Sequence, residues 1–350
     1  MQKTKNVKMK RDDGFSVEIG NAKHLSNMEE TQYFFCKEGI FQLQMADNID
    51  PERINPDLKH NVIQISSYST SNIFVSRIFI QFDKMLKTNF LDARLNQNKI
   101  KYLMFECLKR LLYCQSSYNE LVKQINFKIE NFNQEEYLKS SVIKNQPFLE
   151  DLDEKVRSLI ICQAGHFYRD TINIFKEFFS NRLSNNKKRE IGDKRLDNLI
   201  TWCIHQFGEE DKLTEFLKSH HNEWIKKFVT IRNKLEHPSV NEFIEILNFR
   251  ILPSGDIHVP CWKLVHKDYP HEESSDLLYD IKAYIENLFR FYENLILFCI
   301  EKNIMHDGIA NLCKIFRIPD NEIDNDLPIL FTLEIDPTEF QKRVQKANKI

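Results

Sequence analysis

The chain contains very few glycines, and this scarcity limits the folds that it can adopt. Only 8 of its 350 residues are glycine, whereas 27 are phenylalanine. Glycine supplies many tight turns and phosphate-cradling loops, so this composition favours long helices joined by few turns. Neither G-x-G-x-x-G nor G-x-x-x-x-G-K-[ST] occurs, which argues against a dinucleotide-binding domain and against a nucleotide-hydrolysing enzyme with a P-loop.

The remaining composition is that of a globular protein. Hydrophobic residues make up 42% of the chain and charged residues 29%, enough to form a buried core. The formal net charge of −2 means that nucleic-acid binding would need a local basic patch. The 8 cysteines form no C-x-x-C pair, so we interpret them as buried, reduced thiols of a cytoplasmic protein. No secretory signal and no apolar run of membrane-spanning length is present, so we expect no membrane association.

Hydrophobic periodicity predicts a mainly α fold, an elongated helical bundle with small β-containing appendages at both ends. We expect a mixed N-terminal appendage over 1–65, a helical domain over 66–302 and a C-terminal appendage over 303–350. A β-hairpin at about 243–265, around Pro253-Ser-Gly-Asp256, would be an insertion in the helical domain. The predicted helices span residues up to Thr88, then 98–131, 152–181, 195–207, 212–236 and 274–301. The predicted strands outside the hairpin span 15–19, 34–45 and 329–335.

One segment, Arg232-Asn233-Lys234-Leu235-Glu236-His237-Pro238, has a chemically suggestive pattern. A residue before proline is disfavoured in the α region, so the helix should stop at about His237 and leave that histidine at an exposed end. Arg232 and His237 are five residues apart, which is roughly 140° around an ideal helix. They can act together only if the helix end distorts at Pro238, or if a second copy of the helix faces the first.

Arginine and histidine together suit metal-independent RNA cleavage. A neutral imidazole can take the proton of an RNA 2′-hydroxyl that attacks the neighbouring phosphate. A guanidinium is always charged, and its planar donors can hold the phosphate oxygens in the transition state. His237 would be the base or acid and Arg232 the phosphate ligand, while the amide of Asn233 could orient the imidazole or the phosphate. We expect neither a metal nor another cofactor.

Arg232-Asn233-x-x-x-His237 resembles the R-x(4–6)-H motif of the HEPN superfamily, in which a polar residue commonly follows the arginine. The resemblance covers at most about residues 95–302. It implies a four-helix domain that dimerises to form the active site of a metal-independent endoribonuclease. It also implies products with 2′,3′-cyclic phosphate and 5′-hydroxyl ends, and a role as a toxin, abortive-infection factor or other anti-phage defence component. The expected partners are an RNA substrate, a second copy of the chain, and an antitoxin or defence-system protein.

A purely structural interpretation of the same segment stays open. Arg232 and Glu236 would form an i,i+4 ion pair on a solvated helix face, Asn233 would be a surface residue, and His237-Pro238 would be a helix stop. The chain would then be a non-catalytic helical interaction or scaffold module. A third interpretation is a toxin that is silenced by a partner antitoxin.

Three further groups of residues are weaker candidates. His166, Tyr168, Arg169 and Asp170 lie on one predicted helix and could line the cleft, with His166 and Asp170 spaced to pair. A basic loop could contact RNA phosphates, or could simply be solvated; its cations are Arg182, Lys187, Lys188, Arg189, Lys194 and Arg195. A zinc site could be imagined at two places, but neither spacing matches a familiar ligand pattern; the residues concerned are Cys203, His205, His220 and His221, and Cys261, His266 and His271.

Overall fold

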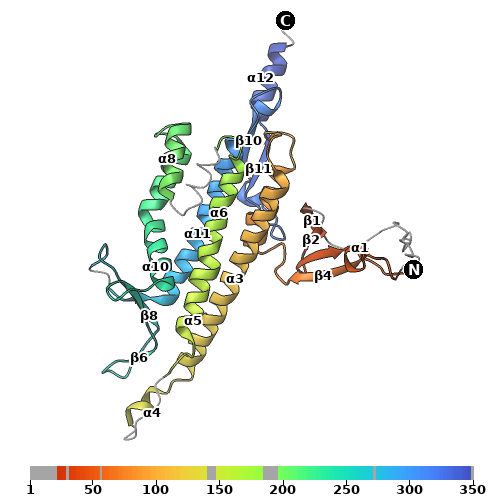
Figure 1. Ribbon diagram of the computed structural model, residues 1–350. Coiled ribbons are helices and arrows are strands. Elements are labelled where there is room, and N and C mark those ends of the chain that lie inside the picture. The colour runs from red at the N-terminus through yellow and green to blue at the C-terminus, as the bar shows by residue number, and fades with distance from the viewer. Residues whose placement is uncertain are drawn as a thin grey trace, which may run out of the picture. The chain divides into compact units, whose positions relative to one another are not determined.

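The computed structural model describes residues 22–28, 31–55, 57–139, 147–183, 196–270 and 273–347 (Figure 1). The chain divides into two compact units. The terminal unit comprises Met1–Met104 and Asn303–Ile350, and the central unit comprises Phe105–Lys302. The boundary at Met104 lies inside one long helix, α3 (Gln97–Glu130). Residues 66–104, which we expected in the helical domain, therefore belong with the two terminal segments.

The terminal unit begins with a four-stranded antiparallel sheet in the order β1-β2-β3-β4. Phe34 and Cys36, two residues apart and therefore on one face of β2, form a small apolar cluster with Leu43. Gly39 turns the chain between β2 and β3 with a φ of +144°, and a Cβ there would lie 2.2 Å from the carbonyl oxygen of Ser66. The strands are β1 (Ala22–Met28), β2 (Thr31–Cys36), β3 (Ile40–Gln44) and β4 (Asn61–Ser66), and the short helix α1 (Ala46–Ile49) precedes β4.

The rest of the terminal unit combines helical segments with a second hairpin. The π-helical segment η1 (Val75–Ile80) continues into α2 (Gln81–Leu86), and β10 (Cys313–Arg317) pairs with β11 (Phe331–Ile335). The side-chain oxygen of Gln81 accepts hydrogen bonds from the backbone N–H groups of Leu330 and Phe331, which fixes the hairpin to α2. Short 3-10 turns η4 (Ala310–Leu312) and η5 (Asp320–Glu322) and the helix α12 (Pro337–Ala347) complete the unit.

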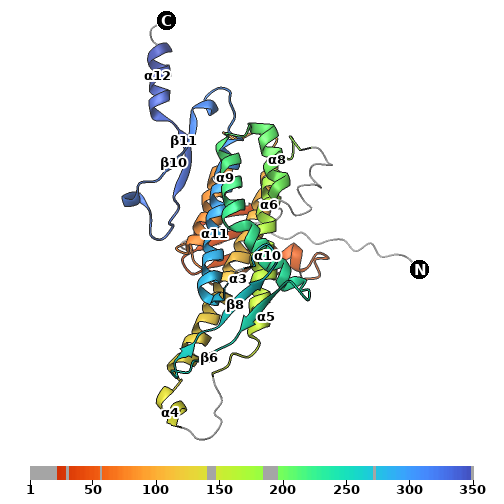
Figure 2. The same cartoon turned by 90° about the vertical axis from the view of Figure 1, so that its left-hand side faces the viewer.

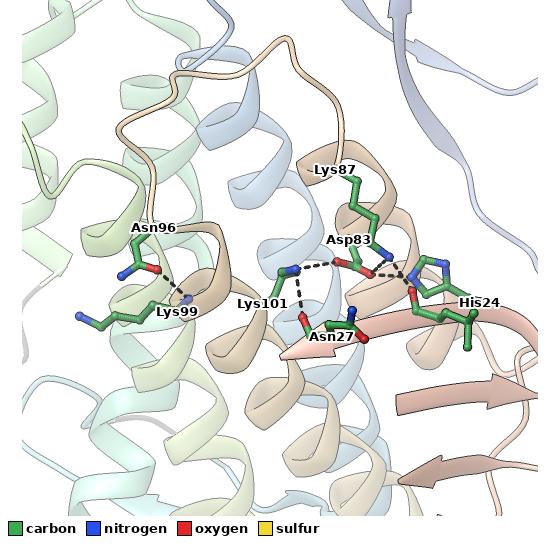
Figure 3. A network of polar contacts seen from close by, with 8 residues as sticks. His24, Asn27, Asp83, Lys87, Asn96, Lys99 and Lys101 are labelled. Atoms are coloured by element: carbon green, nitrogen blue, oxygen red, sulfur yellow. Dashed lines mark hydrogen bonds and ion pairs between the residues drawn. The ribbon is translucent and has the colours of Figure 1, made fainter. Parts of the chain in front are cut away.

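A buried charge cluster joins β1, α2 and the start of α3 within the terminal unit (Figure 3). Asp83 is fully buried, and its Oδ2 lies 2.6 Å from Nε2 of His24 and 2.8 Å from Nζ of Lys87. Lys101 Nζ lies 3.9 Å from the other carboxylate oxygen of Asp83 and donates to the carbonyl of Asn27. The cluster therefore surrounds a buried carboxylate with three positively charged or hydrogen-bonding side chains, although Oδ1 of Asp83 itself accepts no hydrogen bond from the described residues.

The central unit carries the long helices (Figure 2). Helices α6 and α11 run side by side, and α10 packs against η2. The predicted helix over 98–131 is confirmed within one residue at each end by α3. Besides α3, the helices among the described residues of the unit are α4 (Gln134–Lys139), α5 (Leu152–Arg157), η2 (Ser158–Ala164), α6 (Gly165–Phe178), α8 (Leu196–Phe207), α9 (Lys212–His220), η3 (His221–Ile225), α10 (Lys226–Glu236) and α11 (Leu277–Glu301).

The predicted hairpin is present in the central unit as two short strand pairs. β5 (Phe243–Leu247) pairs with β8 (Cys261–Val265), and β9 (Ser275–Asp276) extends that sheet in the order β5-β8-β9. The inner pair, β6 (Arg250–Ile251) and β7 (Ile257–His258), flanks the turn with Gly255 at a φ of +85°. The indole N–H of Trp262 donates to Asp280 at 2.7 Å, which attaches this hairpin to α11.

The prediction of a mainly α bundle is wrong. The chain is about 54% helical and 19% strand, and its described residues form four small sheets. The long helices show a clear hydrophobic period in the sequence. Each strand is too short to show a comparable period, although the strands together make up a substantial part of the chain. β10 was not anticipated because it pairs with a strand that begins 14 residues after it ends, from Arg317 to Phe331. The predicted strand over 15–19 lies outside the described residues.

None of the described helices combines the length and the apolar character needed to cross a membrane. All eight cysteines are free thiols, and all except Cys162 are buried.

Candidate functional site

The helix that carries the Arg/His segment ends just before Pro238, as predicted from the sequence. α10 stops at Glu236, and His237 leaves the helical conformation with φ −133° and ψ 70°. The backbone N–H of His237 still donates to the carbonyl of Asn233 at 2.7 Å. The imidazole is 79% exposed. His237 is thus held at the last hydrogen bond of the helix while its side chain is directed by a non-helical backbone.

The distorted helix end brings Arg232 and His237 to one carboxylate. Nη2 of Arg232 lies 2.6 Å from Oε2 of Glu236, and Nε2 of His237 lies 3.6 Å from the same oxygen. Because both distances run to one atom, the two nitrogens cannot be farther apart than the sum of these lengths. The sequence offered two ways to bring these side chains together, and distortion at Pro238 does so within a single chain.

Neighbouring residues hold the Arg232 guanidinium in place. The side chain is only 12% exposed, and Nη1 donates to Oδ1 of Asn233 at 2.9 Å. Its stem crosses Gly165, where a Cβ would lie 3.3 Å from Cγ of Arg232, closer than most such contacts. Asn233 therefore orients the guanidinium, not the imidazole, and the lack of a side chain at Gly165 leaves room for the arginine.

Arg232 and Asn233 line a cavity of about 440 Å³ between α6, α8 and α10. Four of the described lining residues are Arg or Lys, whereas Asp197 is the single carboxylate among them and is paired with His221 at 3.3 Å. Apolar side chains such as Ile172 and Phe228 form the rest of the wall. The cations are Arg169, Lys176, Lys226 and Arg232. Such a wall suits an anionic ligand with an apolar part.

The predicted cleft residues of α6 separate into two groups. Tyr168 and Arg169 line the cavity, and burial raises the pKa of Tyr168, so its phenol stays protonated. His166 and Asp170 are not among the lining residues. They meet through Arg110, which lies 3.2 Å from Nδ1 of His166 and 2.5 Å from Oδ2 of Asp170.

The imidazole of His166 is nevertheless close enough to the site for the arginine charges there to shift its pKa. Burial lowers the pKa of His166, and the positive charges of Arg110, Arg169 and Arg232 lower it further. Because Arg110 can only donate, Nδ1 of His166 is the acceptor and the proton of the neutral ring lies on Nε2. His166 therefore acts in this structure as a fixed neutral partner of Arg110.

Sequence reasoning missed several residues of the cavity. Val229 lies four residues before Asn233 and Lys226 seven before it, so both share its helix face. Asn173 and Lys176 likewise follow Arg169 by four and seven residues. Helical spacing from the motif was the signal that would have found them. Gly165 gave no such signal, because only the packing of α6 against α10 shows what it must accommodate.

The basic loop contributes little to the described part of the site. The guanidinium of Arg182 donates to the carbonyl of Lys302 at 3.2 Å and lies over the ring of Phe179. It is therefore attached to the ends of α6 and α11 and is not part of the cavity wall. The other predicted RNA contacts lie outside the described residues: Lys187, Lys188, Arg189, Lys194 and Arg195.

The residues considered for zinc have other partners. His220 accepts a hydrogen bond from the indole of Trp224 at 2.8 Å, and burial lowers its pKa. Burial raises the pKa of the Cys203 thiol to about 12, which disfavours the thiolate that a metal binds. Within the described ranges, no group of three or more His, Cys, Asp or Glu residues could hold a metal ion. His271 lies outside those ranges.

Comparison of the chain with protein-family models, with curated proteins and with solved structures finds no match. Any functional assignment therefore depends on the chemistry of the residues around Arg232.

Proposed function

We propose that this chain is a metal-independent endoribonuclease of HEPN type, acting as an anti-phage defence factor or toxin. The observation that carries the proposal is the approach of Arg232 Nη2 and His237 Nε2 to a single carboxylate oxygen. A guanidinium and an imidazole so placed can serve one phosphate group, because charge-assisted hydrogen bonds of about 2.7–2.9 Å from each would meet on its oxygens.

The reaction assigned to these groups is transfer within the RNA strand. The imidazole of His237 takes the proton of a 2′-hydroxyl, the O2′–phosphorus bond forms, and the phosphorus–O5′ bond breaks. The departing O5′ takes a proton from water and the protonated imidazole of His237 returns its proton to the solvent, so the products are a 2′,3′-cyclic phosphate and a 5′-hydroxyl. Arg232, oriented by Asn233, stabilises the charge on the non-bridging oxygens.

The cavity beside Arg232 supports RNA as the ligand. Lys226 and Asn233 are seven residues apart on α10, which is about 10 Å along the helix. That length can follow more than one phosphate of a strand, with Arg169 and Lys226 as contacts beyond the reacting group. Apolar side chains between the cations would pack against a sugar or base.

The direct test is RNA cleavage by the full-length chain in EDTA. The expected products carry cyclic phosphate and 5′-hydroxyl ends, detected by mass spectrometry and by kinase labelling of the new 5′ ends. A strand with 2′-O-methyl groups should stay intact, because it lacks the attacking hydroxyl. If the wild-type chain leaves unmodified RNA uncut across a range of sequences, pH values and protein concentrations, the proposal fails.

We also propose that two copies of the chain associate with the ends of their α10 helices facing a shared cleft. The exposed imidazole of His237 and the 93% exposed Val240 that follows it support an interface there. Light scattering should give twice the chain mass, and specific activity should fall on dilution because the shared cleft that holds the RNA needs both chains.

Mixing two inactive variants shows whether one active site takes its residues from one chain or from both. We expect Arg232→Ala and His237→Ala subunits, unfolded together and refolded, to stay inactive, because each active site takes both side chains from one chain. Recovery to about one quarter of wild-type activity would instead mean that Arg232 and His237 of one site come from different subunits, as random pairing predicts.

A second function, a non-catalytic interaction or scaffold module of a defence or toxin–antitoxin system, is favoured by one contact. The ion pair of Arg232 with Glu236 neutralises the guanidinium that catalysis would use. This module would leave RNA intact in EDTA, so the same cleavage assay separates the two functions.

A further inference from the structure

Glu236 occupies a position that the proposed reaction needs for its substrate. Its Oε2 accepts from Nη2 of Arg232 at 2.6 Å and faces Nε2 of His237 at 3.6 Å. These are the two nitrogens assigned above to the phosphate group. The carboxylate therefore contacts the proposed phosphate ligand and lies close to the proposed base.

A carboxylate is a close chemical stand-in for a phosphate at such a place. Both present a pair of anionic oxygens to the planar fork of a guanidinium. The side chain of Glu236 is 33% exposed and lies at the last residue of α10, so it can turn towards solvent without disturbing the core. The arginine, by contrast, is 12% exposed, its guanidinium donates to Asn233, and its stem packs closely over Gly165. Of the two partners, the glutamate is the one that can leave.

We infer that Glu236 is an internal competitor that fills the phosphate subsite of this chain and must be displaced when a phosphate ligand binds. The inference rests on the proposed function, because that function assigns the subsite to a phosphate. Replacing an ordinary binding residue weakens ligand binding, whereas replacing Glu236 should have the opposite effect. Removing the carboxylate should tighten binding, since the ligand would no longer have to break an ion pair or approach a like charge.

A different role for Glu236 would give different results. A glutamate that positions His237 for catalysis would lower kcat when it is changed and would leave ligand affinity unchanged. A glutamate that only closes the helix end would alter the melting temperature and affect all ligands alike. The test must therefore measure affinity, not activity alone.

The experiment compares the binding of two probes by fluorescence anisotropy and by calorimetry. The first probe is a labelled 2′-O-methyl oligonucleotide, which cannot be cut, and the second is inorganic phosphate. We expect Glu236→Gln to bind the oligonucleotide more tightly than wild type, on the order of three- to tenfold. Tightening with both probes assigns the subsite to any phosphate group, whereas tightening with the oligonucleotide alone assigns it to a phosphodiester in a strand.

Matched variants separate this effect from a change of net charge. Glu215→Gln removes an equal charge from an exposed position on α9 and should leave the affinity within about twofold of wild type. Glu236→Asp keeps the charge but shortens the side chain by one methylene, so it should also tighten binding. In an Arg232→Ala background, Glu236→Gln should no longer tighten binding, because the contact it relieves is already gone.

The outcomes divide clearly. Tighter binding by Glu236→Gln that depends on Arg232 supports the inference. If wild type binds the oligonucleotide and cuts RNA but Glu236→Gln binds no more tightly than Glu215→Gln, the inference fails while the proposed function stands. If neither wild type nor Glu236→Gln binds either probe, both fail together.

Discussion

Replacing His237 with alanine should lower RNA cleavage by about a hundredfold to ten-thousandfold, the range expected when a general base is lost. The melting temperature should not change, because the imidazole is 79% exposed and contacts the surface carboxylate of Glu236 at 3.6 Å. Affinity for an uncleavable strand should change little, since the arginine and not the histidine carries the permanent charge. Single-turnover cleavage rates, together with thermal unfolding of the same samples, measure both quantities.

The matched control is His205→Ala, which removes an exposed histidine from α8. It should cut RNA at the wild-type rate. Equal cleavage by His237→Ala and wild type would remove His237 from the mechanism, even if RNA were still cut. Loss of cleavage accompanied by a lower melting temperature would show damage to the fold and would give no support to a catalytic role.

Asp83→Asn should destabilise the terminal unit by about 3–5 kcal/mol, the cost of removing one partner from a buried ion pair. The substitution keeps the shape of the side chain but leaves Lys87 and the largely buried Lys101 without their counter-charge. Denaturant unfolding of the full-length chain should show an early transition in the variant. A matched Asp57→Asn variant, changed at an exposed position of the same unit, should unfold like wild type.

The same cluster makes the stability of the terminal unit depend on pH. Burial lowers the pKa of His24 despite the nearby Asp83, so the unfolded chain takes up the histidine proton first and stability falls as the pH drops below about 6.5. Burial pushes the pKa of Asp83 upward, but hydrogen bonds from His24 and Lys87 outweigh it and the pKa lies below its usual value. Its contribution is present above the unfolded pKa of 3.8 and is lost at lower pH.

In Asp83→Asn, the second, more acidic part of this loss should disappear. Unfolding free energies measured from pH 8 to pH 3 would show it as a shallower slope below about pH 4. Identical slopes in variant and wild type would mean that the ionised carboxylate contributes nothing to the stability of the native unit.

The helices were predictable wherever one pattern ran for many residues or met a proline. The apolar side chains of α3 repeat with a helical period over 34 residues, and Pro238 marks the end of α10. The strands were underestimated because β10 pairs with a segment whose position only the folded chain determines. The terminal unit could not be predicted either, since it joins residues from both ends of the sequence.

The candidate site was predictable in its chemistry but not in its geometry. The sequence singled out Arg232, Asn233 and His237, and it anticipated the Arg232–Glu236 ion pair that the structure contains. Helix spacing could not tell that His237 would turn back towards the same carboxylate, because that turn depends on the backbone angles of one residue. Gly165 was equally hidden, since its importance comes from a side chain 67 positions later in the sequence, Arg232.

The π-helical segments η2 and η3 set the rotation of the helices that follow them, α6 and α10. η2 ends immediately before Gly165, the first cavity residue of α6, and η3 ends immediately before Lys226 and itself contributes His221 and Ile225 to the cavity wall. A turn closed from i to i+5 holds one residue more than an α turn, which rotates everything after it by about 100°. Each helix therefore has one rotational setting before the wide turn and another after it, and the second setting places both core and cavity residues. Losing a single residue from His221–Ile225 would leave α9 in its present register but turn Arg232 away from Gly165, together with the buried Phe228, Ile231 and Leu235 of α10.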